Sequence, residues 1–200
     1  MQSWATSWQL IGRILKRAVE NMEREQDHDL NFTSNFNSIC GPTISITCYL
    51  NRIQMYANCS DSCYILAFIY IDRLLQNNPW FVLSSRNVHR LILSAVVLAI
   101  KYLDDSYAEN STYAKIGGVS LSEINVLERD MIKLLGYNLF VDSEIYHQYV
   151  HELELQSQKI AEESIGEEID CAEKYIKPIT TVSSMTSIRT VPSLSEMTYE

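Results

Sequence analysis

The chain has 200 residues, of which 46% are hydrophobic and 20% are charged, with only 6 Gly and 4 Pro. This is the composition of a packed globular protein, and the length suits about one domain. The net charge of −9 argues against nucleic-acid binding, because neutralising phosphates needs clustered Lys and Arg. The longest apolar run, residues 91–100, falls short of the roughly 20 residues of a membrane-spanning helix, so we expect a core helix and no membrane association.

Five cysteines, an odd number without a C-x-x-C pair, occur at positions 40, 48, 59, 63 and 171. Because no secretory leader is recognisable, we expect reduced thiols and a cytoplasmic and/or nuclear location. Cys59 and Cys63 flank a predicted helix start without a Gly-rich loop or a nucleophile motif nearby. We therefore interpret them as buried or capping thiols.

The first predicted element is an amphipathic helix at about residues 3–25, followed by a polar connector up to residue 40. Gly41-Pro42 is predicted to begin the next helix, because the fixed φ of proline suits a first helical turn. Its expected buried stripe comprises Ile44, Ile46, Leu50 and Ile53. A further helix follows, with an N-cap among Asn58, Ser60 and Asp61 and an end at Asn77-Asn78-Pro79.

The middle of the chain predicts a central helix that begins after Ser84 or Ser85 and runs to Lys101, apolar on nearly every face. A short helix at about 113–116 should end at Gly117-Gly118. Ser120 and Glu123 have the spacing of a capping box, in which each side chain bonds the backbone amide of the other residue. They predict the start of a helix that Gly136 ends.

Asp142 or Ser143 is expected to cap a long acidic helix, and residues 178–200 are predicted to form a disordered Ser/Thr-rich tail. No strand-length alternation of apolar and polar residues occurs, so the predicted fold class is all-α. The predicted organisation is an N-terminal helix and connector (1–40), a five-helix domain (41–141), a C-terminal helix (142–177) and the tail (178–200).

Six sequence blocks carry a resemblance to a known family: Tyr49-Leu50-Asn51-Arg52-Ile53, Tyr70-Ile71-Asp72-Arg73-Leu74, Asn87-Val88-His89-Arg90-Leu91, residues 99–105 (AIKYLDD), residues 113–120 (YAKIGGVS) and residues 123–128 (EINVLE). Their order and spacing resemble the cyclin box, most closely that of the phosphate-pathway P/U-type cyclins. The resemblance implies a single five-helix cyclin box and a non-catalytic subunit that binds and activates a cyclin-dependent serine/threonine kinase. It implies no cofactor and no metal.

The resemblance also implies a kinase-binding face where the third and fifth helices of the box end. Motif matching assigns to this face the charged pair Lys101 and Glu128, which should grip the backbone around the kinase's regulatory helix. A carboxylate can accept from unpaired donors at a helix start, and an ammonium can donate to carbonyls. We expect both side chains to be exposed in the free chain. The matching apolar positions are Leu98, Tyr102, Ile132, Tyr137, Leu139 and Phe140.

Asp72 and Arg73 lie on a helix whose other faces are apolar, so we interpret them as a structural ion pair inside the box. The stretch Thr43-Ile44-Ser45-Ile46-Thr47 departs from the substrate-docking patch of mitotic-type cyclins. Only about 60 residues follow Gly136, which leaves no room for a second box.

Three other readings stay open. His147 and His151 have the i, i+4 spacing of two metal ligands, but the zincin pattern and a third ligand are missing, so surface histidines are the better interpretation. A TFIIB-like cyclin-box transcription factor would need a basic face. A kinase-independent helical scaffold would neither copurify with a kinase nor raise its activity.

Overall fold

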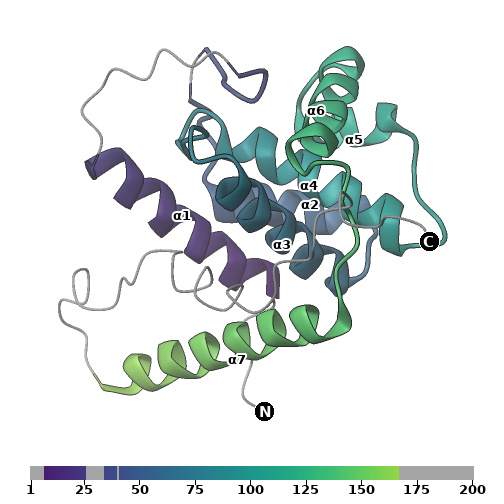
Figure 1. The fold of residues 1–200 in the computed structure, drawn as a ribbon. Coiled ribbons are helices and arrows are strands. Elements are labelled where there is room, and N and C mark those ends of the chain that lie inside the picture. Colours follow the sequence, from purple (N-terminus) through teal and green to yellow (C-terminus); the bar gives the residue numbers. More distant parts are fainter. Residues whose placement is uncertain (1–6, 26–33, 40, 167–200) are drawn as a thin grey trace, which may run out of the picture. The chain divides into compact units, whose positions relative to one another are not determined.

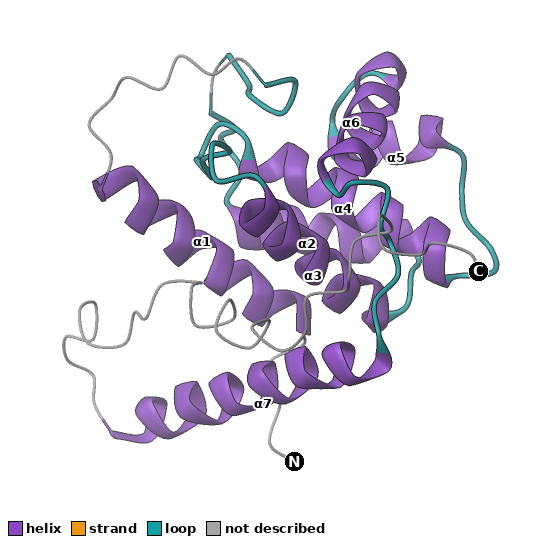
Figure 2. Cartoon of the chain, in the orientation of Figure 1, coloured by secondary structure: helices purple, strands orange, loops and turns teal. Residues whose placement is uncertain are grey.

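Helices make up most of the part of the chain that the structure, a computed structural model, describes, namely residues 7–25, 34–39 and 41–166. Seven helices and no strand occur within these ranges (Figure 2). The predicted all-α class is therefore confirmed. The predicted tail lies outside the described residues, as do residues 167–177 of the predicted C-terminal helix.

The centre of the fold is α4 (Val88–Leu103), which is buried on nearly every face from Val88 to Ile100. It packs against α2 (Ile46–Ala57), α3 (Asp61–Asn77), α5 (Asn110–Gly117) and α6 (Leu121–Leu134), which surround it in Figure 1. A helix that is apolar all round is stable only when other elements cover all of its faces. The predicted central position of this helix is confirmed.

Two helices flank this group. α1 (Ser7–Glu25) packs on α2 and α3 through buried side chains that recur at helical spacing, namely Trp8, Ile11, Leu15 and Val19. α7 (Ser143–Gly166) packs against α3 through Tyr149 and Leu153 and also contacts α1 (Figure 1). The two flanking helices thus both rest on α3.

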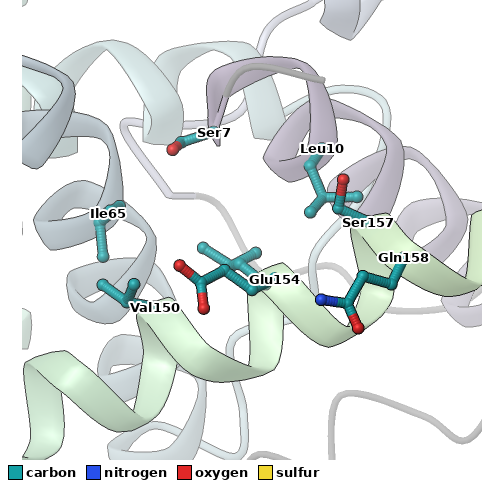
Figure 3. A pocket seen from close by; sticks show the side chains of 8 residues that line it. Ser7, Leu10, Ile65, Val150, Glu154, Ser157 and Gln158 are labelled. Carbon is teal, nitrogen blue, oxygen red and sulfur yellow. The ribbon is translucent and has the colours of Figure 1, made fainter. Parts of the chain in front are cut away.

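A cavity of about 380 Å³ lies where α1, α3 and α7 meet. Figure 3 shows apolar side chains from all three helices around it, with polar groups of α1 and α7 beside them. Its lining consists of Ser7, Leu10, Ile65, Val150, Leu153, Glu154, Ser157 and Gln158. The side chains of α1, α3 and α7 thus leave space between them at this point.

The predicted start of α2 is wrong, because Pro42 lies four residues before the first helical residue. Ser45 is the N-cap, and its Oγ accepts a hydrogen bond from the backbone N–H of Cys48 at 3.2 Å. The carbonyl of Ile44 instead bonds Nε2 of the buried His89 at 2.9 Å. This contact from α4 holds the segment before Ser45 outside the helix.

The ends of α4, α5 and α7 show which of the predicted helix caps form. The N-cap of α4 is Asn87 and not Ser84 or Ser85 as predicted. The Asn87 side chain accepts a hydrogen bond from the backbone N–H of Ser84 at 2.9 Å, which closes a turn before the helix. Gly118 ends α5 in the left-handed conformation at φ 70°, as predicted. Asp142 accepts from the backbone N–H of Glu144 at 2.8 Å at the start of α7, so the predicted Asp142 cap is confirmed.

Only half of the predicted capping box forms. Ser120 Oγ accepts from the backbone N–H of Glu123 at 3.1 Å, as expected. The Glu123 carboxylate does not reach back but pairs with Arg90 of α4, with Oε1 2.6 Å from both Nε and Nη2. A carboxylate oxygen that accepts from two N–H groups of a charged guanidinium is bound more strongly than one that accepts from a neutral amide. Glu123 therefore joins α6 to α4.

Candidate functional site

Lys101 and Glu128 form an ion pair across two neighbouring helices. Lys101 lies in the last turn of α4, and its Nζ is 2.6 Å from Oε1 of Glu128 in the middle of α6. The second carboxylate oxygen of Glu128 accepts from Nδ2 of Asn110 in α5 at 2.8 Å. Asn110 also donates to Asn125 at 2.7 Å. The two charges assigned by motif matching are thus brought together, and α5 holds the acid in place.

The expectation that both charges are exposed is wrong in part. The side chains of Lys101 and Glu128 are 25% and 16% exposed, since each covers the other. Glu128 also lies in the body of α6 rather than at its end. A partly buried pair of this kind is screened less by salt than a surface pair, while its outer lone pairs and protons remain open to another molecule.

The six apolar residues assigned to the kinase-binding face differ in how far they are exposed. Tyr102, Tyr137 and Phe140 are exposed, the last two by 72% and 66%. Ile132 and Leu139 are partly exposed. Leu98 is only 4% exposed, so the prediction that it lies on a contact surface is wrong. It faces the interior because α4 turns that face toward the other helices.

Leu103, next to Tyr102 in the chain, is a further exposed apolar side chain at the end of α4, although the family resemblance does not assign it to the kinase-binding face. It is the last residue of α4 and 43% exposed. The available signal was an apolar side chain directly before the polar pair Asp104-Asp105, at the point where a buried helix emerges. We call the set Lys101, Tyr102, Leu103, Glu128, Ile132, Tyr137, Leu139 and Phe140 the α4–α6 surface.

The segment 137–140 is held in place by α3. The Tyr70 hydroxyl donates to the carbonyl of Leu139 at 2.9 Å. Arg73 Nη1 donates to the carbonyls of Asn138 and Phe140 at 2.9 and 3.1 Å. Since backbone bonds leave the side chains free, these contacts present Tyr137, Leu139 and Phe140 outward.

The predicted ion pair between Asp72 and Arg73 is wrong, because consecutive residues on a helix point in different directions. Arg73 points to the segment 137–140, whereas Asp72 is buried beneath α7. There Asp72 accepts from the Tyr149 hydroxyl at 2.5 Å and from Gln76 Nε2 at 2.6 Å. Burial raises the pKa of Asp72 to about 6, although both hydrogen bonds act in the opposite direction.

The histidine pair of α7 lies on the surface of the protein. His147 and His151 are both exposed on α7, as the surface interpretation predicted. No group of three His, Cys, Asp or Glu residues is arranged to hold a metal ion within residues 7–25, 34–39 and 41–166. In the same ranges, none of the helices combines the length and the apolar character needed to cross a bilayer.

Comparison with known proteins gives consistent similarities. A family model described as cyclin matches residues 10–139, from α1 into the segment 137–140. The chain is 45% identical to Cyclin-U4-2 of Arabidopsis thaliana over 121 residues, which are 60% of this chain and 56% of that protein. It is 35% identical to Cyclin-U1-1 of the same plant over 179 residues, 88% and 85% of the two chains.

A third similarity comes from another plant. Cyclin-P4-1 of Oryza sativa subsp. japonica is 42% identical over 116 residues, 58% of this chain and 55% of that protein. The matched part of Cyclin-U4-2 and Cyclin-P4-1 is thus slightly more than half of their length. These similarities confirm the resemblance to P/U-type cyclins that the sequence blocks indicated.

Proposed function

Because this chain is a member of the cyclin family, we propose that it is a non-catalytic regulatory subunit that binds and activates a cyclin-dependent serine/threonine kinase. The observation that carries the proposal is the Lys101–Glu128 ion pair with exposed Tyr102, Tyr137 and Phe140 in the same α4–α6 surface. Aromatic side chains beside a few polar groups are typical of the centre of a protein interface.

The chemistry of the pair suits contact with backbone. Glu128 has lone pairs left on both oxygens after bonding Lys101 and Asn110, and these can accept from the unpaired N–H groups at a helix start. Lys101 uses one of its three protons on Glu128 and can donate the others to carbonyls. Such contacts depend on the position of the bound helix and not on its amino-acid sequence, because they are made to its backbone.

Activation follows from the part of the kinase that is bound. Phosphoryl transfer needs a Lys–Glu ion pair in the kinase, and its Glu is carried by a movable regulatory helix. A protein that binds this helix only in its inward position shifts the population toward the active arrangement. The shift has to overcome a few kcal/mol, which an interface of ordinary size supplies. We propose a cytoplasmic and/or nuclear location for this activity.

The test exchanges the two charges of the pair. The double variant Lys101→Glu, Glu128→Lys keeps opposite charges side by side, so helicity and thermal stability should change little. In this variant a hydrogen-bond donor faces the kinase where the wild type presents an acceptor, and the reverse. Binding to purified cyclin-dependent kinases should therefore weaken by at least about tenfold. Calorimetry measures the binding, and phosphorylation of a peptide measures the activation.

A matched control exchanges the other ion pair between the same helices. Arg90→Glu with Glu123→Arg alters a pair near the N-terminal end of α4, away from Lys101, and should leave kinase binding unchanged. If both double variants bind as the wild type does, the α4–α6 surface is not the kinase site. If the folded wild-type chain neither binds nor activates any kinase of the panel, the scaffold alternative replaces the proposal.

A further inference from the structure

Two cysteines lie four residues apart in the chain at the start of α3. Cys59 lies two residues before the helix begins, and Cys63 lies in its first turn. Each thiol shifts the pKa of the other, which places the two side chains near each other. Cys63 is fully buried, whereas Cys59 is partly exposed and both are free thiols. One member of the pair is therefore open to a small reagent and the other is shielded.

The surrounding polar groups hold this pair. Ser60 Oγ lies 3.3 Å from the sulfur of Cys63, which donates to Asp104 Oδ2 at 3.4 Å. The sulfur of Cys59 lies 3.4 Å from the Tyr64 hydroxyl. Ser60, although at the N-cap position of α3, bonds Asp104 Oδ1 at 2.9 Å instead of capping the helix. The thiols thus lie in a cluster of side-chain bonds between the start of α3 and the end of α4.

The two thiols differ in acidity. The nearby Cys63 thiol is the main cause that lowers the pKa of Cys59, and together with the Tyr64 hydroxyl and a backbone group it outweighs burial and the Asp104 charge, both of which raise it. The Cys59 thiol and burial raise the pKa of Cys63. The thiolate therefore forms on the accessible residue, and the thiolate is the nucleophile in thiol chemistry.

We propose that Cys59 and Cys63 are a modification site at which a hydroperoxide such as hydrogen peroxide forms a reversible intramolecular disulfide. The Cys59 thiol first loses its proton to water. Its sulfur attacks one peroxide oxygen, the O–O bond breaks, and the departing hydroxide becomes water as it takes up that proton. The sulfur is thereby oxidised to a sulfenic acid.

The second step closes the bond. Cys63 attacks the oxidised sulfur of Cys59, the S–S bond forms, the S–O bond breaks, and the hydroxide leaves as water with the proton of Cys63. Two thiols and one peroxide thus give one disulfide and two waters. Closure removes the bond from Cys63 to Asp104, which directly follows Leu103 of the α4–α6 surface.

The experiment maps the bond in the full chain. Purified protein is treated with hydrogen peroxide, free thiols are blocked, and the chain is cut with trypsin after Arg52 and with an endoprotease that cuts before Asp61. These cuts place Cys59 and Cys63 alone in the separate peptides 53–60 and 61–71. Mass spectrometry should find these two peptides linked, and dithiothreitol should separate them.

Variants and a control residue decide the result. Cys59→Ser should leave Cys63 reduced, whereas Cys63→Ser should stop at sulfenic acid on Cys59, trapped by dimedone. Cys48 is exposed and without a thiol neighbour among the described cysteines, so it reports general oxidation. The proposal is overturned if peptides 53–60 and 61–71 stay unlinked while Cys48 is oxidised, or if Cys59 is linked only to another chain. Neither outcome depends on a kinase.

Discussion

At the scale of single residues, Asp72 is a titratable carboxyl group buried in the interior of the protein. It is 1% exposed, and no ion pair within the described residues includes it. Burial raises its pKa from 3.8 to about 6, so the folded chain holds this proton more tightly than the unfolded chain does. The carboxyl therefore stabilises the fold most below its unfolded pKa, and this contribution is lost as the pH rises through about 6.

Asp72→Asn should remove this pH dependence. Between about pH 4 and pH 7 the free energy of unfolding of the wild type should fall by on the order of 2 kcal/mol relative to the variant. Urea unfolding at several pH values measures the difference. His89, whose pKa burial lowers, acts in the opposite direction but equally in both proteins. Parallel pH profiles of the two proteins would show that Asp72 does not titrate in this range.

At the scale of elements, the segment 137–140 depends on α3 for its shape. Gly136 and Tyr137 make the turn from α6 into this segment, and both have positive φ, at 62° and 60°. A left-handed conformation is unfavourable for a tyrosine, so the surrounding structure has to maintain it. Tyr70 and Arg73 do so by bonding three successive carbonyls, from Asn138 to Phe140. Arg73 thus acts as a positioning residue for the α4–α6 surface.

Arg73→Met should loosen this segment without unfolding α3, because the aliphatic part of the side chain is kept while two charge-assisted bonds are lost. Hydrogen exchange at the amides of residues 137–141 should become faster, while exchange in α4 stays as in the wild type. Arg86→Met is the control, since Arg86 is exposed and, within the part of the chain that the structure describes, only its backbone carbonyl is bonded. Equal exchange in the two variants would contradict the positioning role.

At the scale of the whole molecule, the flanking helices complete the burial of α3. The connector contributes as well, because Phe36 is 1% exposed and packs edge-on against Phe81 with ring centroids 5.9 Å apart. The composition of this connector predicts only a polar loop and does not reveal this buried contact. α7 closes over Asp72 through Tyr149, whose ring also lies edge-on to Phe68. The attachment of α7 is therefore partly polar and partly apolar.

Tyr149→Phe should weaken this attachment. It keeps the ring contact but leaves Asp72 with one donor fewer in a buried position, which costs about 1–3 kcal/mol of unfolding free energy at neutral pH. Tyr146→Phe, one turn earlier on α7 and partly exposed, should change stability by less than about 0.5 kcal/mol. Thermal or urea unfolding compares the two. A Tyr149 variant as stable as the Tyr146 variant would show that the bond to Asp72 contributes nothing to folding.

The sequence by itself determined the helices and most of their ends. Apolar spacing located α4 and its all-round burial, Gly118 and Ser120 marked an end and a start by local backbone chemistry, and the motif blocks indicated the family. These features depend on interactions between residues close in the chain, which a pattern records directly.

Only the tertiary structure decided which partner each polar side chain bonds. Glu123 had a backbone amide within local reach yet pairs with Arg90, and Ser60 bonds Asp104 instead of its own helix. Leu98 and Leu103 occur in one apolar helix, but neighbouring helices bury the first and leave the second exposed. The competing bonds differ by only about 1 kcal/mol, so the element that packs nearest selects between them, and local sequence carries no record of that element.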